Sequence, residues 1–312
     1  MTGPILSVAI ITYKHEAFIE QCLESVFAQE TPWEFEIVIG DDCSPDSTCA
    51  RIKRVAAQRR RDVRLLERPA NIGGPNNLLD VFAACRGRYV ALLEGDDYWT
   101  SPHKLERQVS SLEAHPEWAM CFTRSDWTQA DGHETRTGTY PVPPERSSYG
   151  LDDLLREGNF IATATAVYRR EVLTRLPEWY VRMKIGDFPL HVLAATSGRV
   201  GFLPEVTAVH RRHAGGMWSG VQEIKRLQGA VTMYEDLGRH LDLSGLGSYR
   251  EGLARHVAAL VWPLRGERRN GAAIGAAWRA LQVTPGVTKC HLMAQLGRQG
   301  VKRTFGRVAR GA

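Results

Sequence analysis

Two pairs of adjacent aspartates each follow an apolar segment of the sequence. Asp41 and Asp42 come after FEIVIG at residues 35–40, and Asp96 and Asp97 come after YVALLE and a glycine. Paired carboxylates can bind a hard divalent cation, or accept hydrogen bonds from a nucleobase or a ribose. Gly-Asp-Asp is also common in turns, and an aspartate can cap the next helix. Two such pairs favour a functional site over two unrelated turns.

The apolar pattern predicts the elements that must position these pairs. Short apolar runs predict strands buried on both faces, and apolar residues three to four positions apart predict helices. The predicted strands are residues 5–11, 35–40, 63–67, 89–94 and 118–123. The predicted helices are residues 17–29, 50–60 with Ser44 or Asp46 as the cap, 76–87 with Gly87 as the stop, and one that begins at Ser101-Pro102 and runs through Leu112.

The order of these elements predicts the fold class. Strands that alternate with helices over the first 125 residues predict an α/β fold with a mostly parallel sheet. Functional groups in such sheets lie beyond the carboxyl ends of the strands, where both aspartate pairs fall. After residue 123 the pattern changes. It predicts a loop at residues 128–150, a β-like stretch at 158–170, a helix that starts near Asp187, a strand-turn-strand at 199–213, and helices from about residue 221.

Composition and motif searches exclude several classes of protein. The chain has 312 residues and six scattered cysteines without metal-ligand spacing, so we expect buried reduced thiols. No basic segment typical of a signal peptide and no run of about 18 apolar residues is present, which predicts a cytoplasmic protein. The formal net charge of +5 does not by itself indicate nucleic-acid binding. A dinucleotide fingerprint after the first strand and a P-loop are both missing.

The C-terminal region is strongly basic. After Glu251 the only acidic residue is Glu267, against eleven lysines and arginines. One interpretation is peripheral contact with an anionic membrane at its inner face. The alternative is a basic helical face that packs on the rest of the protein or on a second subunit, as in a homodimer. Without a recognised motif, we predict no nucleic-acid partner.

Five ordered motifs over about residues 4–220 resemble glycosyltransferase family 2. They are SVAIITYKHEAFIEQCLESVFAQ, EIVIGDDCSPDST, NIGG, GRYVALLEGDDYW and GDFPLHVLAATSGRVGFLPEVTAVHRRHAGGMWS. The resemblance implies a GT-A (Rossmann-like) fold and an inverting hexosyltransferase that uses a nucleotide sugar linked to UDP or dTDP. It also implies a DxD-type metal site for Mn²⁺ or Mg²⁺. The acceptor would be a glycan, a lipid-linked molecule or a small molecule, as in polysaccharide or glycoconjugate biosynthesis.

The resemblance also assigns roles to individual residues. Asp42 would contact the nucleotide base with support from Asp41, and Asp96 would reach the ribose or the sugar. Other residues predicted to bind the donor are Thr12, Tyr13, Glu16, Asn71 and Trp218.

The metal and the base are assigned in the same way. Asp97 would bind the metal directly, and His213 would approach the metal and the diphosphate. Asp187 would be the catalytic base, although an aspartate at that position could simply cap its helix. Because His210 stands where relatives often have Tyr, it departs from the pattern. So do Lys14 and the Pro75-Asn76-Asn77 stretch, which lacks a basic residue.

The predicted organisation has two parts. Residues 1–219 would form the catalytic domain, with donor binding in about 1–125 and the acceptor side in about 126–219. Residues 220–312 would form a basic helical region. Two other functions remain as alternatives. One is a sugar-phosphate nucleotidyltransferase, which would release pyrophosphate, and the other is a non-catalytic protein that binds nucleotide sugars.

Overall fold

The computed structural model describes most of the chain and divides it into two compact units. The described residues are 3–59, 63–130, 135–139, 141–143, 146–183, 186–216 and 222–283. The first unit comprises residues 1–154 and 159–216, and the second comprises residues 155–158 and 217–312. The roles predicted for residues 1–125, 126–219 and 220–312 stay predictions.

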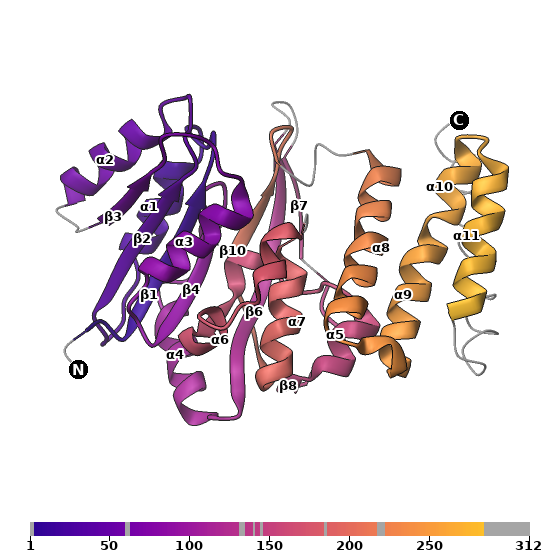
Figure 1. The fold of residues 1–312 in the computed structure, drawn as a ribbon. Helices are drawn as coiled ribbons and strands as arrows, with labels where there is room; N and C mark the ends of the chain where they lie inside the picture. The colour runs from indigo at the N-terminus through magenta and orange to yellow at the C-terminus, as the bar shows by residue number, and fades with distance from the viewer. Residues whose placement is uncertain are drawn as a thin grey trace. The chain divides into compact units, whose positions relative to one another are not determined.

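Four parallel strands form the N-terminal part of the sheet, in the order β3-β2-β1-β4 (Figure 1). Each was predicted as an apolar run, and the helices between them make these strands successive βαβ units. The strands are β1 (Leu6–Thr12), β2 (Phe35–Asp41), β3 (Val63–Glu67) and β4 (Tyr89–Glu94). The helices are α1 (Ile19–Phe27), α2 (Thr48–Arg59) and α3 (Gly74–Ala84).

Helices cover both faces of these strands. The side chains of Leu6, Val8 and Ile10 on β1 pack in one core with residues of α1, α2 and α4 (Lys104–Ala114). Alternate residues of a strand point to the opposite face. There Gly40 of β2 lies against Asn77 and Val81 of α3. Burial on both faces explains why these strands are almost uniformly apolar.

The rest of the sheet is mixed. Within the described residues it has ten strands in the order β3-β2-β1-β4-β9-β6-β10-β5, with β7 paired to β6 and β8 paired to β10. Strands β6 and β10 are parallel, whereas β9 runs antiparallel to both β4 and β6. The α/β class is confirmed, and the parallel arrangement continues only in part beyond β4. These strands are β5 (Tyr98–Trp99), β6 (Trp118–Ala130), β7 (Thr135–Thr139), β8 (Ser148–Tyr149), β9 (Val167–Arg169) and β10 (Arg199–Arg212).

Three predicted segments differ from the structure. Residues 128–150 are predicted as a loop but contain the end of β6 and strands β7 and β8. Strand β7 pairs antiparallel to β6. Residues 199–212 form one strand instead of strand-turn-strand. Its register shifts between Leu203 and Val206, around Pro204, because proline donates no hydrogen bond and is accommodated at a bulge. Of the β-like stretch at 158–170, only β9 is a strand, preceded by a 3-10 turn at Thr163–Thr165.

Two predicted helix ends also differ. Helix α4 begins at Lys104 instead of Pro102, and Gln29, two residues beyond the end of α1, contacts this terminus. Gln29 Oε1 accepts the Leu105 N–H at 3.1 Å, and Gln29 Nε2 donates to the Ser101 carbonyl at 2.8 Å. Helix α3 ends at Ala84 with Cys85 as its cap, so Gly87 is not the stop.

Four short elements complete the first unit before β10. They are α5 (Leu151–Glu157), which continues into the second unit, α6 (Arg170–Leu173), a 3-10 turn at Glu178–Arg182, and α7 (Asp187–Ser197). The prediction of a helix that starts near Asp187 is confirmed.

The second unit is helical in its described residues, as predicted. Its helices are α8 (Glu223–His240), α9 (Gly247–Ala259), α10 (Val261–Gly266) and α11 (Asn270–Val283), with a 3-10 turn at Leu243–Gly245. Among the described residues, no helix is both long enough and apolar enough to cross a membrane. Six of the eleven C-terminal basic residues lie beyond residue 283, outside the described residues.

Gly87 allows a close approach between the start of β4 and β1. A Cβ at this position would lie 2.5 Å from backbone atoms of Leu6 and Ser7. We expect Gly87→Ala to lower the free energy of unfolding by about 1–3 kcal/mol, because the strand backbone must shift to make room. Urea denaturation measures the change. Gly74→Ala is the matched control, since a Cβ there meets nothing within 4 Å, and an equal loss in both variants would contradict this role.

Candidate functional site

The register of three parallel strands brings their carboxyl ends to one edge. Thr12 of β1 pairs with Asp41 of β2, and Ile11 pairs with Glu94 of β4. The residues that follow β2 and β4 therefore leave the sheet side by side. These are the two aspartate pairs of the sequence, as predicted for strand ends in an α/β sheet.

The first aspartate pair holds the surrounding loops in place. Asp41 accepts hydrogen bonds from the backbone N–H of Ser44 at 2.8 Å and from its hydroxyl at 2.6 Å. Asp42 accepts the N–H groups of Ile72 at 2.7 Å and Gly73 at 2.9 Å, one on each oxygen. Both aspartates are almost fully buried. Asn71 joins them, since its side-chain amide donates to the Asp42 carbonyl at 3.1 Å.

The loop after β1 is tied to the loop after β2. The backbone N–H of Ser47 donates to Glu16 Oε2 at 3.0 Å, and that of Glu16 donates to Asp46 at 3.3 Å. Tyr13 is partly exposed, and the Thr12 hydroxyl is buried without a hydrogen-bond partner in the described part of the chain. The predicted donor residues other than Trp218 thus lie on connected loops at this edge. Trp218 is outside the described residues.

Asp96 lies against two histidines. Its Oδ2 atom is 3.0 Å from His213 Nε2 and 3.6 Å from His15 Nε2. The guanidinium of Arg211 donates to the Asp96 carbonyl and to the Gln21 side chain. Burial would raise the pKa of Asp96, but the hydrogen bond from His213 and the nearby His15 outweigh it and lower the pKa.

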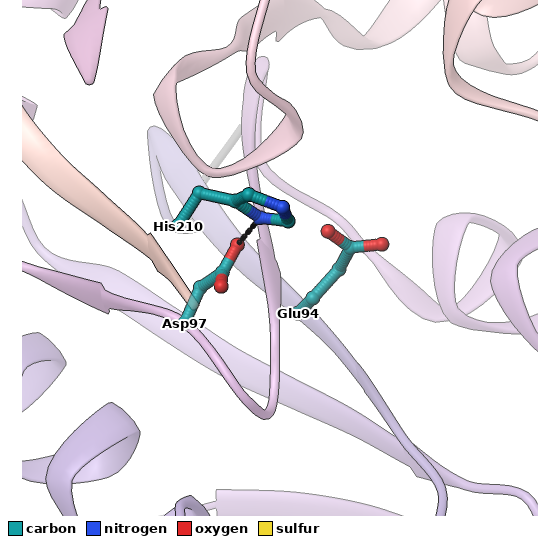
Figure 2. Close-up of side chains that lie close together, drawn as sticks. All are labelled: Glu94, Asp97 and His210. Atoms are coloured by element: carbon teal, nitrogen blue, oxygen red, sulfur yellow. Dashed lines mark hydrogen bonds and ion pairs between the residues drawn. The ribbon is translucent and has the colours of Figure 1, made fainter. Parts of the chain in front are cut away.

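Asp97 lies with a different set of residues. Its Oδ1 atom accepts the backbone N–H of Arg211 at 2.8 Å, and its Oδ2 atom is 3.3 Å from His210 Nδ1 (Figure 2). One ligand atom from each of Glu94, Asp97 and His210 lies within 4.8 Å of the other two. Carboxylate oxygens and imidazole nitrogens are the donors that suit a divalent ion such as Mn²⁺. The observed donor set therefore fits a divalent cation.

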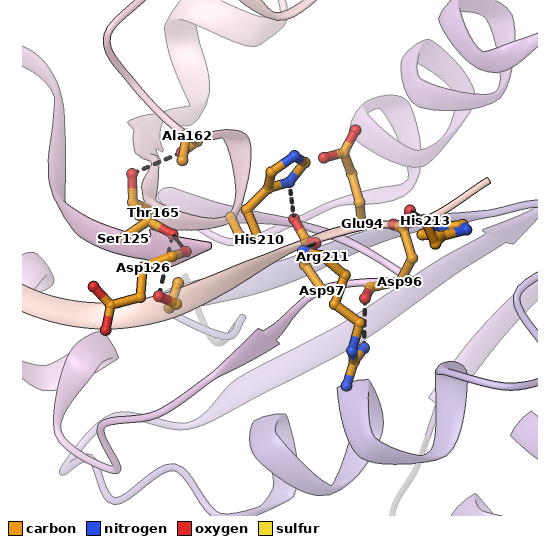
Figure 3. A network of polar contacts seen from close by, with 12 residues as sticks. Glu94, Asp96, Asp97, Ser125, Asp126, Ala162, Thr165, His210, Arg211 and His213 are labelled. Carbon is orange, nitrogen blue, oxygen red and sulfur yellow. Dashed lines mark hydrogen bonds and ion pairs between the residues drawn. The ribbon is translucent and has the colours of Figure 1, made fainter. Parts of the chain in front are cut away.

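The acids of the site lie close together, with Asp97 fully buried and Glu94 and Asp96 mostly buried. Burial raises the pKa of Glu94 well above its ordinary value, and the charges of Asp97 and Asp96 raise it further. Burial also raises the pKa of Asp97, even though His210 opposes this. For His210, the bond to Asp97 overcomes burial and raises the pKa. Figure 3 shows these acids with His210, Arg211 and His213 in one polar network.

Asp187 belongs to the same electrostatic environment. Its charge also raises the pKa of Glu94, although the two residues come from α7 and β4. The cap position of α7 is Gly186, and Asp187 is the first helical residue. Its Oδ2 atom accepts a hydrogen bond from the side-chain amide of Asn159 at 2.6 Å. The structure thus brings a fourth acid toward the carboxylate cluster.

His191 follows Asp187 by one turn of α7 and is completely buried. Neither ring nitrogen has a hydrogen-bond partner among the described residues. Its ring stacks near Tyr168, with centroids 6.3 Å apart. Burial lowers the pKa of His191 to about 4, although Asp187 opposes this. The ring is therefore neutral at physiological pH.

Sequence reasoning missed two residues of the carboxylate cluster. Glu94 was treated only as the end of a strand, and His210 only as a departure from a family pattern. The structure places His213 against Asp96 instead of Asp97. The signal for Glu94 was available, because an acid that ends an apolar strand lies at the same edge as the pair that follows it.

A scan against protein families matches residues 7–176 to the model described as "Glycosyl transferase family 2". Among curated proteins, the chain is 35% identical over 285 residues to "Uncharacterized protein Rv1520" of Mycobacterium tuberculosis. This alignment covers 90% of this chain and 76% of that protein.

Two solved structures share the fold. One is TarS 1-349 of S. aureus in complex with UDP-GlcNAc, with a TM-score of 0.58, 16% identity, and coverage of 90% of this chain and 93% of the other. The second is mannosyltransferase PcManGT of Pyrobaculum calidifontis in complex with GDP-Man and Mn2+. Its TM-score is 0.61 at 18% identity, and the match covers 96% of this chain and 81% of the other. These similarities confirm the GT-A fold.

His191 should make stability depend on pH. Because its folded-state pKa of about 4 lies below the ordinary 6.5, the unfolded state takes up the proton first as pH falls. Above pH 6.5 this contribution to the free energy of unfolding is fully present. As the pH falls from 6.5 to 4, the free energy of unfolding decreases by up to about 3 kcal/mol. We expect His191→Leu to flatten the dependence. Urea denaturation at neutral and acidic pH measures it.

The exposed His103 provides the control, since His103→Gln should keep the slope of the wild-type protein. An unchanged slope in His191→Leu would show that the dependence arises elsewhere.

Proposed function

The chain belongs to glycosyl transferase family 2, and from this premise we propose that it is an inverting, metal-dependent enzyme. It would move a hexosyl group from a UDP- or dTDP-sugar to an acceptor hydroxyl by single displacement. The observation that carries this proposal is the cluster of ligand atoms from Glu94, Asp97 and His210, which lie within 4.8 Å of one another at the strand edge. The charge of Asp187 also acts on Glu94, which supports a base close to the site of the leaving group.

We infer that the first aspartate pair and its loops bind the nucleoside. A carboxylate has about four lone-pair positions, and Asp42 uses two of them for the N–H groups of Ile72 and Gly73. The others can accept the N–H of a pyrimidine base while the loop stays in place. Thr12, Tyr13, Glu16 and Asn71 would line the same pocket, and Asp96 would reach the ribose or the sugar. The role of Trp218 stays a prediction from sequence.

We propose Glu94, Asp97 and His210 as the residues that would hold the cation. Their ligand atoms already lie within 4.8 Å of one another, and the mutual repulsion of the acids favours a positive ion. A bound divalent ion stabilises the negative charge that develops on the leaving diphosphate. The sequence-based proposal of Asp97 with His213 differs in the histidine. His213 would instead keep Asp96 ionised and oriented.

Asp187 would act as the base. Asn159 holds one of its carboxylate oxygens at 2.6 Å, which fixes the orientation of the group and leaves the other oxygen able to accept a proton. As the acceptor hydroxyl attacks the anomeric carbon, its proton passes to Asp187. The bond to the diphosphate breaks on the opposite side, so the configuration inverts. The acceptor class, glycan, lipid-linked or small molecule, stays a prediction, as do the homodimer and the cytoplasmic location.

The role of Asp187 is tested by Asp187→Asn, which keeps the shape but removes the basic oxygen. We expect kcat for sugar transfer to fall by about 10²–10⁴-fold, with donor binding retained. Calorimetry of donor binding, alongside transfer to a panel of acceptors, measures both effects. Asp80→Asn is the control. Asp80 lies on α3, is half-exposed, and forms an ion pair with Arg68.

Each outcome separates the alternative functions. Full transfer activity in Asp187→Asn would refute its role as base. Release of pyrophosphate by the wild-type protein would identify a nucleotidyltransferase. Donor binding without turnover on any acceptor would support a binding protein.

The two histidines are distinguished by their effect on cation binding. We expect His210→Ala to raise the Kd for Mn²⁺, in the presence of a nucleoside diphosphate, by about tenfold or more, since it removes a ligand. His213→Ala is the matched variant and should change this Kd less, because His213 contacts Asp96. Isothermal titration calorimetry gives both values. A larger effect of His213→Ala would restore the assignment made from sequence.

A further inference from the structure

Helix α11 presents its large apolar side chains to solvent. Ile274 is 59% exposed and Trp278 is 65% exposed, more than any other large apolar residue in the described residues. They lie four positions apart and therefore share one face of the helix. Its buried positions are instead occupied by Ala273 and Ala280. This is the reverse of an ordinary amphipathic helix, which buries its large apolar residues.

Helix α11 is packed through small residues on its inner side. The helix packs on α9 and α10 within the second unit (Figure 1). On the outer side, a Cβ added to Gly271 or Gly275 would meet nothing within 4 Å. Gly271, Ile274, Gly275 and Trp278 follow the spacing of one helix face, which we term the α11 face. Its two large side chains, Ile274 and Trp278, remain mostly exposed to solvent and are accessible to a partner.

The sequence that contains and follows α11 is basic. Arg268 and Arg269 directly precede the helix, and Arg279 lies in its last turn. From Arg268 to the end, the sequence contains nine lysines and arginines and no acidic residue. Arg269 forms an ion pair with Glu267, and Arg279 forms one with Glu235, both within the same unit. The excess positive charge of this part of the sequence therefore comes chiefly from its other lysines and arginines.

The charge decides between two occupants of the α11 face. A second copy of the chain would bring one basic stretch against another, and like charges brought together disfavour association. An anionic lipid surface supplies the opposite charge, together with an apolar layer beneath the headgroups. Tryptophan is suited to that boundary, since its ring is apolar and its N–H is polar.

We propose that the α11 face lies on an anionic lipid surface, with Ile274 and Trp278 inserted at the level of the headgroups. The sequence left a membrane contact and an internal packing role equally open for this region. The outward position of the large side chains favours the membrane and specifies which residues enter it. The inference concerns only the second unit and does not depend on the proposed transfer reaction.

Co-sedimentation of the full chain with vesicles tests the proposal. We expect the protein to pellet with vesicles of phosphatidylcholine mixed with phosphatidylglycerol, to pellet little with phosphatidylcholine alone, and to be released by high salt. The double variant Ile274→Ser, Trp278→Ser should lower the partition coefficient by about tenfold. Leu246→Ser is the matched control, because Leu246 is an exposed apolar residue of the same unit outside the α11 face.

A second variant tests the electrostatic part. Arg268→Gln with Arg269→Gln should weaken binding to the anionic vesicles while α11 keeps its apolar residues. Thermal unfolding by circular dichroism checks that every variant is folded, and nucleotide binding in solution should be unchanged.

Two kinds of result would overturn the proposal. One is equal pelleting of the wild-type protein and the Ile274/Trp278 variant, or no pelleting of the wild-type protein with anionic vesicles. The other is a wild-type dimer in light scattering that becomes a monomer in this variant, which would identify a second copy as the occupant. Since the vesicle assay contains no sugar donor, neither result bears on the transfer reaction.

Discussion

Repulsion between carboxylates that are buried together is the constraint on which the site depends. The parallel register of β1, β2 and β4 brings Glu94 and both aspartate pairs to one edge. Burial and like charges favour the protonated form of Glu94 and raise the pKa of Asp97. The end of β10 and the residue after it counteract this effect with His210, Arg211 and His213. Side chains from a strand more than a hundred residues further along the chain thus offset the repulsion between the acids at this edge.

The first aspartate pair solves a different problem. Asp41 and Asp42 are buried as deeply as Asp97, but their carboxylate oxygens accept hydrogen bonds from backbone N–H groups and from the Ser44 hydroxyl. The two pairs therefore look alike in sequence but differ in the groups that contact them. The first pair is held by hydrogen bonds from neighbouring loops, whereas the second lies beside Glu94 and contacts His210, Arg211 and His213.

Much of this arrangement could be predicted from sequence, for identifiable reasons. The apolar runs of β1, β2 and β4 are buried on both faces, so the pattern located the strand ends and hence the aspartates. The start of α7 at Asp187 was predicted equally well. The position of His210 beside Asp97 could not be predicted from sequence. It depends on the register shift around Pro204, which sets where each residue of β10 meets its neighbours. The cap supplied by Gln29 depends on tertiary contact, which local sequence does not encode.

Burial around Asp187 would protect its proposed role as a base. If Asp187 accepts the proton of the acceptor, a neighbouring cation would weaken it by stabilising its charged form. His191 lies one turn away and would be such a cation if it were protonated. Its complete burial keeps the ring neutral, at the cost of two ring nitrogens without hydrogen-bond partners in the described chain. Asn159 then orients the carboxylate with a neutral amide. The apolar setting of α7 thus lets Asp187 be held in place without a positive charge beside it.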